Sequence, residues 1–212
     1  KALLNILETY PRDELIQADA AELLDISTGV LQMQERDMTR LFMRKDAFGR
    51  FVSAIVYLPR ERYNTQLRKD TQQILQQFLG STEPVEFTTY FSESVLARTH
   101  YFVRINDSNI ESNVKDIENN LIEAARTWED KLNSALIGRF GELTGRELSQ
   151  KYVNAFPRAY KEEMLPNDAL VDIAKIEALS EENTLEMLFY RPQEENADSK
   201  AVRLNLFHKD HP

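Results

Sequence analysis

Cysteine and histidine, two side chains often used in catalysis, are absent or rare in this chain. The chain has no cysteine, and its three histidines are His100, His208 and His211. Neither H-x-x-x-H nor H-E-x-x-H occurs, so the spacing typical of zinc sites is missing and we predict no metal site. Ser92 and Ser94 precede His100 closely, which suggests a hydrolase, but no G-x-S-x-G motif surrounds either serine. We therefore interpret the two serines as part of a polar strand connection and His100 as a strand residue.

Glycines that could approach a phosphate group are also scarce. The chain has six glycines, and Gly138, Gly141 and Gly145 follow a predicted helix instead of a strand. Dinucleotide-binding folds need their glycines directly after a strand, where the backbone meets the pyrophosphate. The G-x-G-x-x-G fingerprint and the P-loop are both absent from the sequence. We predict neither catalytic nor cofactor-binding residues in this chain.

The charges are distributed unevenly. Residues 36–69 hold nine basic and three acidic residues, whereas residues 107–130 hold seven acidic and two basic residues. Solvated faces explain this most simply, and charge-complementary docking between domains or protomers is a second explanation. A pocket for an anionic effector is a third, with Arg60 and Arg62 before a helix whose N-terminus favours anions. The candidates for effector binding or docking are Arg60, Arg62, Tyr63, Asn64, Ser92 and Ser94.

The predicted elements that must position these candidates alternate between strands and helices. Residues 39–58 change to a two-residue period around a turn at Asp46–Gly49, which predicts a β-hairpin. A helix follows from Asn64, a typical N-cap, to Gly80. Strands are expected at residues 84–91 and 97–105, and a long helix at 108–140. Two hairpins, each followed by a helix, predict an α+β fold with one four-stranded antiparallel sheet and helices packed on one face.

The rest of the chain is predicted to be helical, with a strand pair at its end. The expected organisation is a helical lead-in at 1–38, the α+β domain at 39–140, a helical segment at 141–183, and at 184–212 a strand pair that begins a further, truncated domain. The chain starts at Lys1 and stops soon after an apolar alternating run. We therefore expect it to be a piece of a longer polypeptide.

The composition is typical of a globular protein, with 42% hydrophobic and 29% charged residues. The formal net charge of −9 disfavours nucleic acid and anionic membranes as partners. No apolar stretch approaches the roughly 20 residues that a membrane helix needs, and no signal peptide opens the chain. Together with the lack of cysteine, these features lead us to expect a cytoplasmic protein.

A resemblance to a known family rests on several long segments. The stretch from Arg40 to Thr65 reads RLFMRKDAFGRFVSAIVYLPRERYNT. It closely resembles the GRFVS…VYxPRxRYNT segment of the large bacterial NAD-specific glutamate dehydrogenases. The stretch VEFTTYFSESVLAR at residues 85–98 is similar to a second segment of that family. The downstream residues that look like its continuation are Ala155–Pro157, Tyr160, Asp172, Ile176–Leu179 and Leu188–Pro192.

The resemblance implies a non-catalytic regulatory or oligomerisation region, N-terminal to the catalytic domain, among modules that resemble ACT domains. The longer enzyme would oxidise L-glutamate with NAD to 2-oxoglutarate and ammonia. Its catalytic lysine and its dinucleotide fold match no position here, so this chain alone is expected to be inactive and to hold no cofactor. The expected partners are other domains of the same chain and other protomers of a homo-oligomer. The alternative is a domain that senses an amino acid or an anionic effector and controls the longer enzyme.

Overall fold

The computed structural model describes residues 2–33, 36–92, 94–106, 113–190 and 202–209. The chain divides into two compact units, Lys1–Arg126 and Thr127–Pro212. We call the first the sheet unit and the second the helical unit, and describe each by itself. In the part of the chain that the structure describes, no helix is long and apolar enough to span a membrane.

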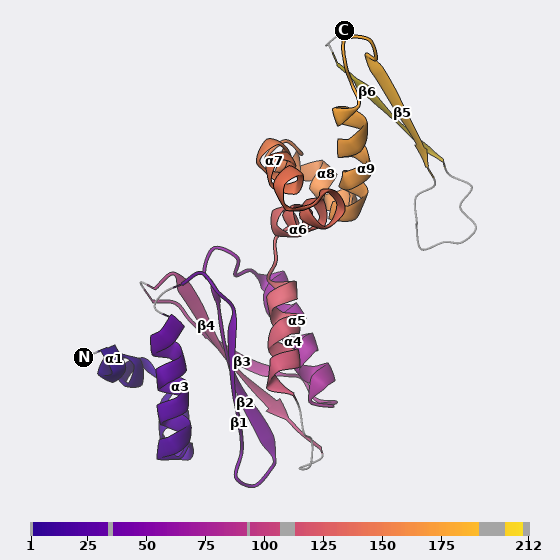
Figure 1. The fold of residues 1–212 in the computed structure, drawn as a ribbon. Helices are drawn as coiled ribbons and strands as arrows, with labels where there is room; N and C mark the ends of the chain where they lie inside the picture. Colours follow the sequence, from indigo (N-terminus) through magenta and orange to yellow (C-terminus); the bar gives the residue numbers. More distant parts are fainter. Residues whose placement is uncertain (1, 34–35, 93, 107–112, 191–201, 210–212) are drawn as a thin grey trace. The chain divides into compact units, whose positions relative to one another are not determined.

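The sheet unit is built on four antiparallel strands (Figure 1). The strands β1 (Arg40–Lys45) and β2 (Phe51–Pro59) form one hairpin, and β3 (Glu86–Tyr90) and β4 (Leu96–Arg104) form the other. The hairpins join through β2 and β4, which gives the order β1-β2-β4-β3. This confirms the predicted fold class, a four-stranded antiparallel sheet made of two hairpins.

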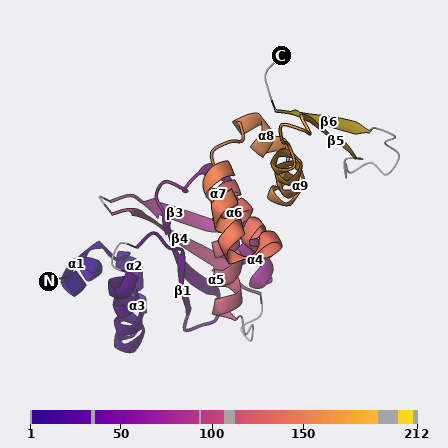
Figure 2. The ribbon, with the colours of Figure 1, turned by 45° about the horizontal axis from the view of Figure 1, so that its top comes forward.

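Two helices cover one face of this sheet, α4 (Thr65–Phe78) and α5 (Val114–Ala124) (Figures 1 and 2). Because successive side chains of a strand point to opposite faces, every second residue of β2 meets these helices. The residues of β2 in this core are Val52, Ala54, Val56 and Leu58. They pack with helix residues that recur at helical spacing: Leu67 and Leu75 of α4, and Ile117 and Leu121 of α5.

The opposite face of the sheet is covered as well, which the sequence analysis did not predict. The helices α1 (Ala2–Thr9), α2 (Arg12–Gln17) and α3 (Ala20–Met33) precede the sheet in the chain, and Figure 2 shows them on the side away from α4 and α5. Tyr10, between α1 and α2, and Ile26 and Met33 of α3 are buried and pack with Ile55, Tyr57 and Leu96. Strand β2 is therefore buried on both faces and forms the centre of the sheet unit.

The prediction of one continuous helix at residues 108–140 is wrong. Residues 107–112 lie outside the described residues, and the remainder forms two helices, α5 and α6 (Trp128–Phe140). Thr127 begins α6 with a capping box: its side chain accepts a hydrogen bond from the Asp130 N–H, and Asp130 accepts one from the Thr127 N–H. The apolar period continues through this cap, so periodicity alone hides the break. The two compact units divide at this point, inside the predicted domain 39–140.

The helical unit continues with α7 (Glu142–Tyr152), α8 (Arg158–Glu163) and α9 (Pro166–Glu177). Its core consists of Leu132, Leu136, Tyr152, Ala169 and Ile173. Gly141, with φ of 83°, separates α6 from α7. Gly145 lies inside α7, where a Cβ would stand 2.5 Å from the Ile137 Cα. This glycine lets α6 and α7 approach each other closely.

A strand pair follows α9 in the helical unit. The strands β5 (Leu185–Tyr190) and β6 (Arg203–His208) pair antiparallel, as the sequence predicts. On one side of the pair the apolar side chains are exposed: Leu185, Met187 and Phe189 of β5, and Leu204 and Leu206 of β6. That this pair begins a further domain remains a prediction.

Candidate docking and effector site

The predicted site residues lie on two neighbouring connections at one end of the sheet. One runs from β2 to α4 and the other from β3 to β4. Pro59 at the end of β2 pairs with Leu96 at the start of β4, so the two connections start side by side. The Arg60 N–H donates to the Val95 carbonyl at 2.8 Å, and the Arg60 guanidinium donates to the Ser92 carbonyl at 2.9 Å. The structure thus brings Arg60 and Ser92 together, although 32 positions separate them.

Tyr63 and Asn64 stabilise this end of the sheet unit locally. The Tyr63 hydroxyl lies 2.8 Å from the Thr89 hydroxyl, and the Tyr63 ring contacts Phe91 edge-on with centroids 5.3 Å apart. Asn64 is the N-cap of α4, as predicted, and its side-chain oxygen accepts from the Leu67 N–H at 2.9 Å. The backbone dihedrals of Asn64 are extended, which is the usual conformation of an N-cap.

Arg62 makes different direct contacts from Arg60. Its guanidinium donates to the Ala125 carbonyl at 3.4 Å and lies 3.7 Å from the Asp37 carboxylate. Ala125 is the C-cap of α5, where unpaired carbonyls and the helix dipole attract a positive charge. Arg62 therefore stabilises a helix end, and its partner Asp37 lines the same hollow as Arg60. That the two arginines bind an anionic effector stays a prediction.

The serines of the β3–β4 connection stabilise a turn. The Ser92 hydroxyl accepts from the Ser94 N–H at 3.2 Å, and the Ser94 hydroxyl accepts from the Leu96 N–H at 3.1 Å. Neither contact involves a histidine. His100 is hydrogen-bonded instead to Ser53, with 2.8 Å between its Nε2 and the serine Oγ.

A hollow of about 610 Å³ adjoins the two connections, and Asp37, Arg60, Glu61 and Val95 line it. One guanidinium and two carboxylates give this hollow no excess of positive charge. Beside it the apolar side chains of Phe91 and Val95 are 55% and 49% exposed, and the Arg60 guanidinium lies over the Phe91 ring at 5.7 Å. We call the exposed side chains of Arg60, Phe91 and Val95 the loop-end surface.

Sequence reasoning missed a buried polar network between α2 and the sheet. Arg44 of β1 donates two hydrogen bonds to the Glu14 carboxylate, both at 2.9 Å. His100 Nε2 lies 3.6 Å from the same carboxylate, next to its contact with Ser53. All four side chains are buried. The sequence contains no motif for such a network, because its members come from α2, β1, β2 and β4.

The network keeps the Glu14 carboxylate ionised. Burial opposes its charge, but hydrogen bonds from His100, Arg44 and Ser53 outweigh that effect and lower the pKa of Glu14 to about 2. A serine, a histidine and a carboxylate lie together here, yet Ser53 and Glu14 both face the same nitrogen of His100. A catalytic triad needs them on opposite ring nitrogens and needs access for a substrate. The arrangement is therefore structural.

The described glycines do not form the strand-to-helix turn of a dinucleotide-binding fold. The glycines with positive φ are Gly49 in the β1–β2 turn, Gly80 after α4 and Gly141 between two helices. None of these three connects a strand to the N-terminus of a following helix, which is the position that pyrophosphate binding requires. Among the described residues no group of three or more histidine or acidic side chains could hold a metal ion.

The sheet, with α4 and α5 on one face, defines an ACT-like α+β domain. Residues 40–129 match the family model described as glutamate dehydrogenase, ACT2 domain. Residues 1–36 match the model for helical motif 1 of glutamate dehydrogenase, and residues 135–179 match helical motif 2. The first range holds the sheet with α4 and α5, the second holds the helices before the sheet, and the third holds most of the helical part of the helical unit, without β5 and β6.

The whole chain is similar to proteins named NAD-specific glutamate dehydrogenase. It is 40% identical to the one from Halomonas elongata and 36% identical to the one from Pseudomonas aeruginosa. Both matches cover 100% of this chain and 13% of the relative. The protein from Mycobacterium tuberculosis is 35% identical over 85% of this chain and 12% of its own length. The chain belongs to the NAD-specific glutamate dehydrogenase family, and it spans 13% of the length of the first two relatives.

Proposed function

We propose that this chain is a non-catalytic regulatory and oligomerisation region of a longer NAD-specific glutamate dehydrogenase. The longer enzyme would convert L-glutamate, NAD and water to 2-oxoglutarate, ammonia and NADH, with the NAD bound outside these residues. The names of the relatives and the match of residues 40–129 to an ACT2 domain support this proposal. The partners would be other domains of the same chain and other protomers of a homo-oligomer.

The loop-end surface is the observation that carries the docking role. Arginine and aromatic side chains are enriched where protein interfaces are fully buried, and a few such residues supply most of the binding energy. Here the Ser92 carbonyl holds Arg60 over Phe91, so the guanidinium is already ordered before any partner arrives. Binding would then cost less conformational entropy, because the Arg60 side chain is preorganised.

Part of the uneven charge is already neutralised inside the sheet unit. Arg40, from the basic segment, donates to Glu118, from the acidic segment, at 3.0 Å. Glu118 also accepts from the Leu41 N–H at 2.8 Å. The charge asymmetry thus supports docking between domains less strongly than the loop-end surface does.

Reversing one charge in the full-length enzyme tests the docking role. Arg60→Glu removes the hydrogen bond to Ser92 and adds a third carboxylate beside Asp37 and Glu61. We expect a smaller assembly in sedimentation velocity or an altered response to effectors, with an unchanged KM for glutamate. Arg158→Glu is the matched control, because the Arg158 side chain is 92% exposed and lies in the helical unit. An Arg60→Glu enzyme that matches the control in both assembly and regulation would refute the docking role.

The second candidate function is a sensor for a small anionic effector or an amino acid. The hollow of about 610 Å³ beside Arg60 favours it, since this volume lies within the usual range for ligand pockets. Isothermal titration of the chain with single amino acids and nucleotides distinguishes the two candidates. Saturable binding that Arg60→Glu abolishes would support the sensor. The absence of saturable binding for all these ligands would favour the docking role.

A further inference from the structure

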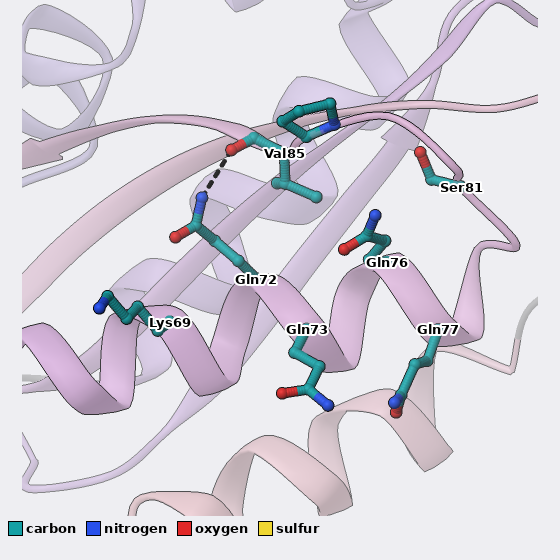
Figure 3. A pocket seen from close by; sticks show the side chains of 8 residues that line it. Lys69, Gln72, Gln73, Gln76, Gln77, Ser81 and Val85 are labelled. Atoms are coloured by element: carbon teal, nitrogen blue, oxygen red, sulfur yellow. Dashed lines mark hydrogen bonds between the residues drawn. The ribbon is translucent and has the colours of Figure 1, made fainter.

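A second pocket, of about 620 Å³, lies along α4, and glutamines line it (Figure 3). Its lining residues are Lys69, Gln72, Gln73, Gln76, Gln77, Ser81, Pro84 and Val85. Residues four apart on a helix lie on the same face, so the α4 side chains that line the pocket form two parallel rows. The inner row is Gln72 and Gln76, and the outer row is Lys69, Gln73 and Gln77.

The two glutamines of the inner row bind backbone carbonyl groups. Gln72 donates to the Val85 carbonyl at 2.6 Å, and Gln76 donates to the Glu83 carbonyl at 3.1 Å. Two glutamines four positions apart thus bind two carbonyls that are two positions apart. Four helical residues rise about 6.0 Å, close to the roughly 6.7 Å that two residues of fully extended chain would span, although Glu83 itself lies in a bend before β3.

The outer row repeats this spacing and is unused. Lys69, Gln73 and Gln77 are exposed, and within the described residues none of their side chains has a hydrogen bond or an ion pair. In Figure 3, Gln72 is directed toward Val85, whereas Gln73 and Gln77 extend on the other side of the helix axis. Each carboxamide there offers both a donor and an acceptor, and Lys69 offers a single positive charge.

We propose that the outer row binds an extended peptide segment that carries an acidic side chain. Gln73 and Gln77 bind main-chain groups two residues apart, as Gln72 and Gln76 do, and Lys69 pairs with the acidic side chain. The row spans eight helical residues, about 12 Å, and four residues of extended chain span about 13 Å, so the register holds over this length. Recognition of main chain is tolerant of sequence apart from the acidic position. The site is separate from the loop-end surface and does not depend on its function.

A labelled peptide tests this site on the whole 212-residue chain. The probe is an alternating Thr-Glu peptide of about ten residues, long enough to cover the row, and an alternating Thr-Lys peptide is its control. Fluorescence anisotropy should show saturable binding of the Thr-Glu probe only. Each of Gln73→Ala and Gln77→Ala should weaken binding about fivefold, the effect of one net hydrogen bond. Alanine is the best helix former, so these variants should keep their fold.

The matched control variant is Gln66→Ala, on the same helix. Gln66 is exposed and donates to Asp70, and it does not line the pocket. Binding should be unchanged in this variant, while Lys69→Glu should weaken the Thr-Glu probe and strengthen the Thr-Lys probe. In NMR titrations, the side-chain amide signals of Gln73 and Gln77 should shift and that of Gln66 should not.

Three results would overturn the proposal. The first is no saturable binding of the Thr-Glu probe to the unaltered chain. The second is that the unaltered chain and the Gln73→Ala, Gln77→Ala double variant bind the Thr-Glu probe with equal affinity. The third is that N-acetylglutamate amide binds as tightly as the Thr-Glu probe. A single residue cannot span the row, so the site would then accept a small molecule instead of a peptide.

Discussion

Single residues decide how the N-terminal helices attach to the sheet. Glu14 of α2 and Arg44 of β1 are 1% and 5% exposed, so both charges have lost nearly all contact with water. The desolvation of such a pair cancels much of its attraction, and its net contribution to stability is small. Removing one partner is costly all the same, because the other charge remains buried without compensation. The pair therefore favours one position of α2 on the sheet over other positions that would separate the two charges.

Glu14→Gln should destabilise the chain by about 3 kcal/mol, because Arg44 would remain charged beside a neutral amide. Urea unfolding followed by circular dichroism measures this change. Glu8→Gln is the control, since Glu8 is exposed on α1, and it should change stability by less than about 0.5 kcal/mol. Equal stability of the two variants would show that the buried pair does not hold α2 on the sheet.

The same carboxylate predicts a pH dependence. The pKa of Glu14 is lowered from 4.5 to about 2 in the folded chain, so the unfolded chain binds more protons between these values. Its contribution to stability is complete above about pH 5 and is lost as the pH falls toward 2. The stability difference between the unaltered chain and Glu14→Gln should therefore shrink over this interval. A difference that stays constant from about pH 5 to about pH 2 would contradict the assignment.

The residues of this network could not be predicted as a group. Glu14 and Arg44 are 30 positions apart, and Ser53 and His100 are 47 positions apart. Each looks ordinary in its own segment, and only the pairing of β2 with β4 brings Ser53 and His100 together. By contrast, the Asn64 cap depends only on its immediate neighbours in the chain, so the sequence predicted it correctly.

At the scale of elements, local signals predicted most of the sheet unit. Both hairpins and α4 followed from strand alternation, helical spacing and a turn at Gly49. The position of α3 on the second face did not follow, because an amphipathic helix does not specify which surface it covers. The break between α5 and α6 did have a local signal, Thr127 with Asp130 three positions later. The continuous apolar period outweighed that signal.

The close packing of α6 on α7 gives a prediction about two glycines. A Cβ on Gly145 would lie 2.5 Å from the Ile137 Cα, a backbone atom that cannot move aside without shifting a helix. Gly145→Ala should therefore cost about 2 kcal/mol, as overpacking typically does. Gly138 lies within α6, and a methyl group added there would meet nothing within 4 Å, so Gly138→Ala should instead add up to about 1 kcal/mol.

Thermal unfolding of the two alanine variants measures both effects under the same conditions. The opposite signs make the comparison sharp, because the substitution is identical and both positions lie in helices of the helical unit. If both variants gain stability, α6 and α7 are farther apart than the structure shows. If both lose stability, helix propensity does not govern the exposed position.

At the scale of the whole molecule, two compact units carry the matches to three family models. Helical motif 1 and nearly all of the ACT2 domain fall in the sheet unit, and helical motif 2 falls in the helical unit. The described helices of helical motif 1, within residues 2–33, thus belong structurally with the sheet that follows them, since they supply its second covering layer. The family boundaries and the compact units describe the chain differently because burial joins segments that sequence models separate.

The chain alone should form no NADH from L-glutamate and NAD. Its positive-φ glycines do not offer the strand-to-helix turn that holds pyrophosphate, and its buried serine and histidine contact each other inside the sheet unit. Absorbance at the NADH band measures turnover, and the full-length enzyme at the same molar concentration is the positive control. Turnover by the chain that persists at constant specific activity through further purification would place an active site in these residues and end the non-catalytic proposal. Turnover that disappears on further purification would instead identify a contaminating dehydrogenase.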